Sequence, residues 1–297
     1  MRALAEFVMR GRMQATLVVV GSAAMPLLLW LSAAASSLVL LRRGANDALG
    51  IVAWAMLPAL VWWYFGDPST VLVLIGTLIL ALLLRANGSW PRVLLGSVAI
   101  GVGYALVLGT VYREPIQAMA AELQKLMPSV LDGADQAWSA EQRAVLDSLI
   151  PPVLTGLMAA MLQVLSLLSL MLGRFWQAAL YNPGGFGREF RALKLSLPQA
   201  LVLLVGMLLG PNLGLEMAML TPLCSVPLLI AGIALVHGLV EKGGLARFWL
   251  VGMYITLFVF GQLIYPLLVV LAIVDSLFDF RGRLVRKTGP GSANGEG

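Results

Sequence analysis

Long uncharged hydrophobic stretches, separated by short charged segments, recur along the 297-residue chain. A helix that crosses the hydrocarbon core of a bilayer, about 30 Å thick, needs about 20 apolar residues. Six stretches reach or approach that length without a charged side chain, and this pattern predicts an all-α, polytopic transmembrane helical bundle. They are residues 48–65, 70–84, 93–112, 149–172, 198–209 and 217–240.

One of these six stretches is too short for a single span, and two further hydrophobic stretches are too long. Residues 198–209 are short and precede Gly210, Pro211 and Asn212, so we expect a half-helix there. Residues 13–41 and 248–274 hold 29 and 27 uncharged residues, too many for one straight crossing. Each contains a central proline, and we expect each to fold back as a hairpin, the first broken at 24–26 and the second near 265–266. With these hairpins the bundle has about ten spans; in the alternative, 198–209 is re-entrant, 248–274 is one tilted helix and the number falls by two, so the prediction is about 8 to 10.

The charged segments between the stretches predict the orientation. Residues 113–147 contain three basic and six acidic side chains, so the positive-inside rule places them outside the membrane. Counting spans back from this segment places Arg85 with Arg92, and then Arg42 with Arg43, on the inner side. With both hairpins formed, the two chain termini also lie on the inner, cytoplasmic side.

We expect one transmembrane domain over residues 1–287, with two large excursions from the membrane. Residues 113–148 form an extracytoplasmic amphipathic insertion, in which a second helix begins at Ser139 with a capping box. Residues 174–197 form a cytoplasmic loop. Residues 288–297, rich in Gly and Ser, are expected to be a disordered tail.

The composition excludes several classes of protein. Hydrophobic residues make up 60% of the chain and charged residues 12%, about half the usual share in a soluble domain, which excludes a soluble protein. One His and one Cys, at opposite ends of one expected span, supply neither a zinc site nor a catalytic triad. We therefore expect no enzyme activity, no metal and no cofactor. The net charge of +5 reflects basic cytoplasmic loops, and no nucleic-acid partner is expected.

Polar groups in or beside the spans are the candidate ligand-binding residues, because polar side chains are costly in lipid and usually have a role there. A helix break near Asn212 would allow a water-lined cavity at the outer face; in the alternative interpretation Glu216 lies among the lipid headgroups. The candidates are Trp30, Asp67, Asn212, Glu216, Gln262 and Tyr265.

The cytoplasmic loop contains an unusual turn sequence. Pro183 and Gly184 are suited to the two central positions of a type II turn that begins at Asn182 and ends at Gly185. The glycines also expose backbone amides that could bind an anion or a partner protein, together with the basic residues Arg188 and Arg191. A purely structural turn is the alternative.

Four segments of the chain resemble the YybS-like family of bacterial inner-membrane proteins, and the likeness extends over nearly the whole sequence. They are residues 4–15, 40–44, 181–186 and 275–281. The family is distantly similar to the S components of energy-coupling-factor transporters, small helical bundles that open outward over a vitamin-like solute. This resemblance implies a multi-pass protein of the bacterial inner (cytoplasmic) membrane. The insertion 113–148 and the extra C-terminal spans depart from a plain S component.

Two functions follow from these features. The first is a module that binds or transports a small solute and resembles an S component, with the lipid bilayer and a small metabolite as its partners. The alternative is a non-transporting scaffold that docks a membrane or cytoplasmic protein through residues 174–197. The chain has no ATPase motif, so any coupling to ATP would come from another protein.

The orientation gives the first testable prediction. Reporter domains fused to the N-terminus and to the C-terminus are expected to report the same, cytoplasmic, compartment, because the two hairpins return the basic segments to one side. A reporter inserted between residues 113 and 148 is expected to report the opposite side. Termini on different sides would contradict the hairpins.

Overall fold

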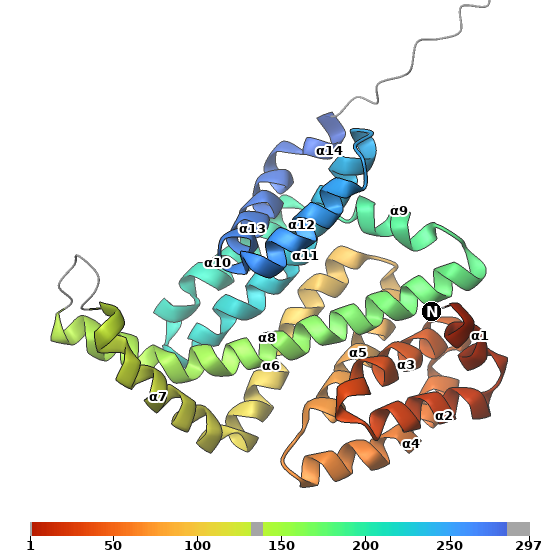
Figure 1. Ribbon diagram of the computed structural model, residues 1–297, viewed down its shortest axis with the longest axis horizontal. Helices are drawn as coiled ribbons and strands as arrows, with labels where there is room; N and C mark the ends of the chain where they lie inside the picture. The colour runs from red at the N-terminus through yellow and green to blue at the C-terminus, as the bar shows by residue number, and fades with distance from the viewer. Residues whose placement is uncertain (1, 132–138, 284–297) are drawn as a thin grey trace, which may run out of the picture. The chain divides into compact units, whose positions relative to one another are not determined.

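The computed structural model describes residues 2–131 and 139–283, and within these ranges every regular element is a helix (Figure 1). This confirms the predicted all-α class. The helices with more than four residues are α1 (Arg2–Arg10), α2 (Arg12–Ala23), α3 (Leu29–Arg43), α4 (Ala45–Tyr64), α5 (Ser69–Asn87), α6 (Trp90–Val111), α7 (Arg113–Leu131), α8 (Ala140–Tyr181), α9 (Gly185–Ala192), α10 (Leu197–Leu209), α11 (Leu220–Lys242), α12 (Phe248–Val259) and α13 (Gly261–Phe278). The 3₁₀ turns η1 (Pro26–Leu28), η2 (Gly210–Leu213) and η3 (Leu215–Met219) and the short α14 (Phe280–Arg283) complete them.

Seven of the described helices are long and apolar enough to cross a membrane, or eight if α9 and α10 together form one broken span. The chain is therefore a multi-pass membrane protein. The number of membrane-spanning helices lies at or below the lower end of the predicted 8 to 10, because α2, α10 and α12 are short. With 12 or 13 residues each, they extend only about 18–20 Å, less than the hydrocarbon thickness.

The chain divides into two compact units. The first comprises the described parts of Met1–Arg188 together with Val202–Pro227, and the second the described parts of Glu189–Leu201 and Leu228–Gly297. Each boundary between them falls inside a helix, namely α9, α10 or α11. The expectation of a single domain over 1–287 stays a prediction, and the expected disordered tail lies outside the described residues.

The N-terminal stretch forms the predicted hairpin. Helix α2 ends at Ala23, η1 begins at Pro26, and α3 packs back along α2 (Figure 1). The Ser32 hydroxyl donates a hydrogen bond of 2.7 Å to the Val19 carbonyl oxygen. Arg43 donates one of 2.7 Å to the Met9 carbonyl oxygen at the other end of the pair. The basic residues at both ends of this hairpin therefore lie together, as the charge pattern requires.

The C-terminal stretch is also broken, but not where the sequence predicted. The helical path stops at Phe260, with φ −116° and ψ 39°, and α13 continues through Pro266. The expected break near 265–266 was therefore wrong. Pro266 lies in the second turn of α13 and removes only the hydrogen bond to the carbonyl of Gln262, and membrane helices tolerate such a loss.

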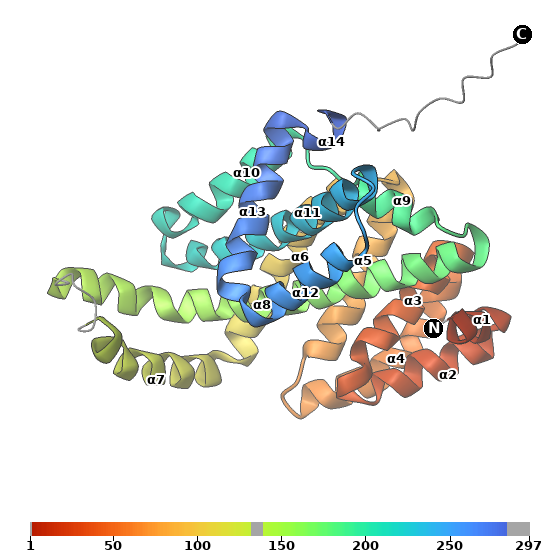
Figure 2. The same ribbon diagram turned by 45° about the horizontal axis from the view of Figure 1, so that its top comes forward.

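Helix α8 is the longest element of the first unit. Its 42 residues extend about 63 Å, twice the hydrocarbon thickness. It begins with the predicted capping box. The backbone N–H of Gln142 donates to the Ser139 hydroxyl, and the backbone N–H of Ser139 donates to the side-chain oxygen of Gln142. The first turns of α8 lie beside α7 (Figures 1 and 2).

A small residue lets α8 pack closely against α3. A Cβ atom added at Gly173 would lie 2.8 Å from the Ala34 carbonyl oxygen and 3.1 Å from the Leu38 amide nitrogen. Ala34, Ser37 and Leu38 are fully buried in this contact. Small residues at helix contacts are the usual means by which membrane helices approach each other, because lipid supplies no hydrophobic driving force between them.

The close contact between α8 and α3 predicts that a larger side chain at position 173 lowers the stability of the protein. Gly173→Val is expected to destabilise the protein by about 1–3 kcal/mol, because the side chain would meet backbone atoms of α3. Gly103→Val is the matched control, since nothing lies within 4 Å of a Cβ atom there. Thermal unfolding of both variants in detergent measures the difference. Equal melting temperatures for the two would contradict the close contact.

Candidate functional site

The first unit contains a cavity of about 510 Å³ between α6, α7, α8 and η3. Its walls combine apolar side chains with four polar ones, of which one is basic and one acidic. The cavity is lined by Ala105, Leu106, Gly109, Arg113, Ile116, Gln117, Pro151, Pro152, Thr155, Glu216, Met217 and Met219.

Three of the four polar side chains in this cavity are available to a ligand. The side chains of Arg113, Gln117 and Glu216 are exposed, and they make no hydrogen bond or ion pair with any other residue that the structure describes. The hydroxyl of Thr155 instead donates to the Pro151 carbonyl oxygen at 2.9 Å. A guanidinium, a carboxamide and a carboxylate therefore line one cavity together with apolar side chains.

Close packing of η3 against α8 closes part of this space. A Cβ atom added at Gly156 would lie 2.7 Å from the Met219 Cα atom and 2.8 Å from its carbonyl oxygen. Met219 and Ile116 are only 8% and 4% exposed, so the inner wall excludes water while the charged side chains remain accessible.

A buried polar group lies deeper in the same helices. Gln163 of α8 is fully buried, and its amide donates to the Ser97 hydroxyl at 2.9 Å and to the Leu223 carbonyl oxygen at 3.3 Å. Pro227 explains the second bond: it has no N–H, so it cannot donate to the carbonyl four residues earlier in α11. The glutamine replaces this missing hydrogen bond from another helix.

The polar group continues toward α5. The Tyr104 and Ser166 hydroxyls lie 2.8 Å apart, and Thr77 donates to the Ser166 carbonyl oxygen at 3.4 Å. These side chains are buried, and with Gln163 and Ser97 they connect α5, α6, α8 and α11. We call Thr77, Ser97, Tyr104, Gln163 and Ser166 the buried polar cluster. It fixes α6 and α8, which carry two of the four cavity walls.

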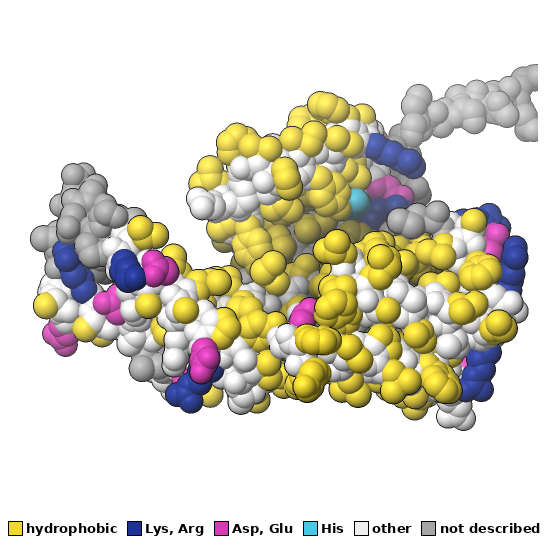
Figure 3. Space-filling view, turned by 60° about the horizontal axis from the view of Figure 1, so that its bottom comes forward, with side chains coloured by type: hydrophobic (Ala, Val, Ile, Leu, Met, Phe, Trp, Pro, Cys, Tyr) yellow, Lys and Arg dark blue, Asp and Glu magenta, His cyan; other side chains and the backbone are white. Residues whose placement is uncertain are grey.

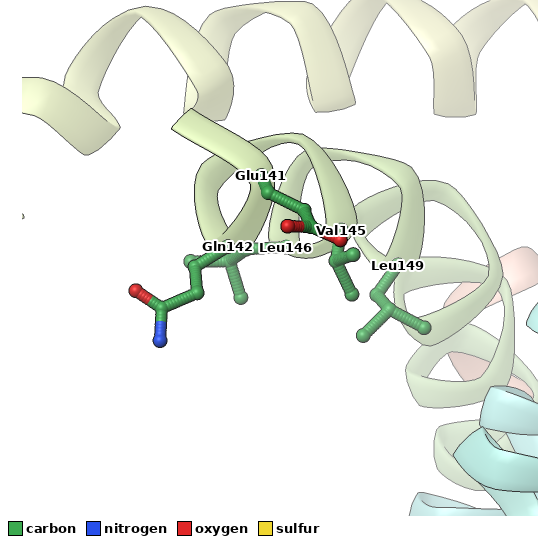
Figure 4. Close-up of a pocket in the computed structure, with 5 residues that line it drawn as sticks. All are labelled: Glu141, Gln142, Val145, Leu146 and Leu149. Atoms are coloured by element: carbon green, nitrogen blue, oxygen red, sulfur yellow. The ribbon is translucent and has the colours of Figure 1, made fainter. Parts of the chain in front are cut away.

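A second hollow, of about 340 Å³, lies along the first turns of α8 (Figure 4). Its five lining residues, Glu141, Gln142, Val145, Leu146 and Leu149, all come from this one helix. Binding sites need polar groups that converge from several elements. The 510 Å³ cavity meets that requirement, and we treat it as the candidate site.

Of the six predicted ligand-binding residues, Glu216 lines the cavity. Asn212 lies on η2, which packs against η3, and its amide reaches the Leu208 carbonyl oxygen at 3.5 Å. Gln262 and Tyr265 lie on α13 of the second unit. That all six line one cavity stays a prediction.

Trp30 and Asp67 have local structural contacts in the first unit. The Trp30 indole donates to the Leu27 carbonyl oxygen at 2.9 Å. The Asp67 carboxylate accepts the Ser69 amide at 2.9 Å, where α5 begins. Burial, and then the negative charge of Asp67, raise the pKa of Tyr112, which follows the last residue of α6.

Sequence reasoning missed Arg113, Gln117 and Thr155 as cavity residues. In the sequence, Arg113 is distinguished only as one of the three basic residues of the acidic segment 113–147. Its place directly after the span 93–112 is the signal that could have identified it, since it puts a cation at the same membrane face as Glu216.

The loop of the first unit forms the predicted turn. The Gly185 amide donates to the Asn182 carbonyl oxygen at 2.9 Å, and Gly184 has φ +78°, as a type II turn requires. The Arg188 guanidinium reaches the Asn182 side chain at 3.4 Å. The Phe186 ring lies edge-on to Trp90 and to Phe175, with both pairs of ring centroids 6.1 Å apart.

Arg191, the other predicted anion-binding residue, belongs to the second unit and forms an ion pair with Glu241. Its carbonyl oxygen also accepts a hydrogen bond of 2.8 Å from the buried guanidinium of Arg281. Arg281 in turn forms a 2.7 Å ion pair with the buried Asp275. Arg191 therefore makes structural contacts within the second unit, and its role in binding an anion stays a prediction.

A second ion pair reinforces this end of α13. Lys194 and Asp279 lie 2.8 Å apart, and the hydrogen bond from Lys194 lowers the pKa of Asp279. The chain at the end of α9 is therefore held to the end of α13 by the Lys194–Asp279 pair and by the Arg191 and Leu193 carbonyl oxygens, which accept hydrogen bonds from Arg281.

Comparison of the chain with protein-family models, with curated proteins and with solved structures finds no match. The resemblance to the YybS-like family therefore stays a prediction. Any function has to be argued from the geometry of the cavity.

The buried polar cluster predicts an energetic coupling between two helices. Gln163→Leu is expected to cost about 1–3 kcal/mol, because it leaves the Leu223 carbonyl oxygen without a donor. In the Pro227→Ala background the cost is expected to fall by about 1 kcal/mol, since residue 227 then supplies the helical N–H. Thermal unfolding of the single and double variants measures this coupling.

The pair Gln124→Leu and Pro227→Ala is the control for the coupling. Gln124 bonds the Asp147 carbonyl oxygen at 3.1 Å and has no contact with Leu223, so the effects of this pair should add. Additivity of the Gln163 and Pro227 changes would instead contradict the assignment.

Proposed function

We propose that this protein binds a small solute in the 510 Å³ cavity, as a solute-binding or transport module of the bacterial inner membrane. The observation that carries the proposal is that one cavity holds a guanidinium and a carboxylate, neither of which has a partner among the described residues, beside several apolar side chains. Ligand sites typically measure about 300–1,000 Å³, with apolar walls and a few placed polar groups. The cavity volume lies in this range, and its lining joins apolar side chains to four polar ones.

The charge distribution supports an opening toward the outer side. The cavity lies where α6 ends and α7 begins, next to the acidic segment that the positive-inside rule places outside. On the displayed face, Lys and Arg side chains line the end of the first unit that holds α1 (Figure 3, right), whereas at the opposite end Lys and Arg are mixed with Asp and Glu. This arrangement, and the likeness to S components, favour a module that takes its solute from outside the cell.

The alternative scaffold function has weaker support. Phe186, the most prominent apolar side chain of the Asn182 turn, already packs against Trp90 and Phe175 within the first unit. A docking loop would be expected to leave this aromatic ring free for its partner.

A thermal-shift screen of the purified protein against small metabolites tests the proposal. At least one solute is expected to raise the melting temperature, because a ligand present at 100 times its Kd stabilises the folded state by about 2.7 kcal/mol. Glu216→Gln should reduce the shift. Glu114→Gln, on the same membrane face but outside the cavity lining, should leave it unchanged. A broad screen with no stabilising solute would contradict the proposal.

A further inference from the structure

We propose that the solute is a zwitterion, a molecule with one ammonium and one carboxylate or phosphate group joined by an apolar part. This inference rests on the proposed function and specifies the chemical class of its ligand. The charges, the walls and the size of the cavity each contribute to it.

The charges favour a ligand that carries both signs. Glu216 and Arg113 line the same cavity, form no ion pair with each other, and have no other partner among residues 2–131 and 139–283. A neutral solute would partly desolvate both side chains without compensation, and a singly charged one would leave one of them uncompensated. A zwitterion pairs with both.

The two side chains also have the geometry to recognise such groups. The planar guanidinium of Arg113 offers paired N–H donors that match a carboxylate or phosphate. The carboxylate of Glu216 accepts hydrogen bonds from an ammonium group, which has three donors and no acceptor. The amide of Gln117 can bond a further polar group of the ligand.

The remaining walls are suited to an apolar part. Ala105, Leu106, Ile116, Pro151, Met217 and Met219 supply them. Methionine side chains adapt to irregular shapes, and two of them lie beside Glu216 on η3. The cavity volume of about 510 Å³ accommodates an amino acid or a dipeptide with an apolar side chain.

Titration calorimetry of the purified full-length protein with matched compounds tests the class. Leucine, leucyl-leucine and 6-aminohexanoate carry both charges at different separations. N-acetylleucine carries only the negative charge and leucinamide only the positive one. At least one of the zwitterions is expected to bind about tenfold or more tightly than both singly charged analogues.

Variants identify the residues that recognise each charge. Glu216→Gln should weaken zwitterion binding about tenfold and remove the preference for the zwitterion over N-acetylleucine. Arg113→Gln should remove the preference over leucinamide. The reversed pair, Arg113→Glu with Glu216→Arg, should restore binding. These changes of preference do not follow from a general loss of stability, and Glu114→Gln is the control.

A phosphoethanolamine lipid headgroup has the same chemistry, and a second comparison separates the two sources. Glycerophosphoethanolamine and vesicles of phosphatidylethanolamine are titrated beside the amino acids. If only the phosphoethanolamine compounds bind, the ligand is a zwitterionic lipid headgroup, and a soluble solute is rejected. Equal binding of N-acetylleucine, leucinamide and leucine would overturn the zwitterion class and leave solute binding intact. If the broad metabolite screen also fails, the proposed function fails with it.

Discussion

The rest of the structure depends on one constraint: inside a bilayer, every backbone carbonyl and amide needs a partner within the protein. Pro227, inside α11, breaks this rule locally, because it leaves the Leu223 carbonyl without its helical donor. The side chain of Gln163, from α8, replaces this donor; in the segment expected outside the membrane, Gln124 of α7 likewise donates to the Asp147 carbonyl, four residues before Pro151. The prolines are therefore retained in continuous helices, and the replaced hydrogen bonds also join the helices of the first unit.

The candidate site is built on these connections. The Gln124 bond holds α7 against α8, and the buried polar cluster holds α5, α6 and α11 against α8. Glycines at 156 and 173 let η3 and α3 approach α8 closely enough to exclude lipid and water. The charged side chains of the cavity thus project from helices whose positions are fixed by bonds deeper in the unit, which is the arrangement that a selective binding site needs.

Particular elements show how far sequence reasoning reached. The break at Pro26, the half-helix before Gly210, the capping box at Ser139 and the turn at Asn182 were all predicted, because each depends on residues near one another in the chain. The break near Pro266 was predicted wrongly. A proline early in a helix removes a single hydrogen bond, and the energy that decides between a kink and a break comes from packing that the local sequence does not contain. For the site, Glu216 was named and Arg113 was not.

The sequence by itself determined the membrane environment, the helical class and most of the helix ends, because hydropathy, capping residues and turn residues act over a few positions. Only the tertiary structure decided which polar side chains meet. Gln163 lies 60 residues from the carbonyl that it bonds, and Arg113 and Glu216 reach one cavity from opposite ends of a long intervening chain. Such contacts follow from how helices pack, and packing depends on side-chain shapes at positions that no local pattern relates.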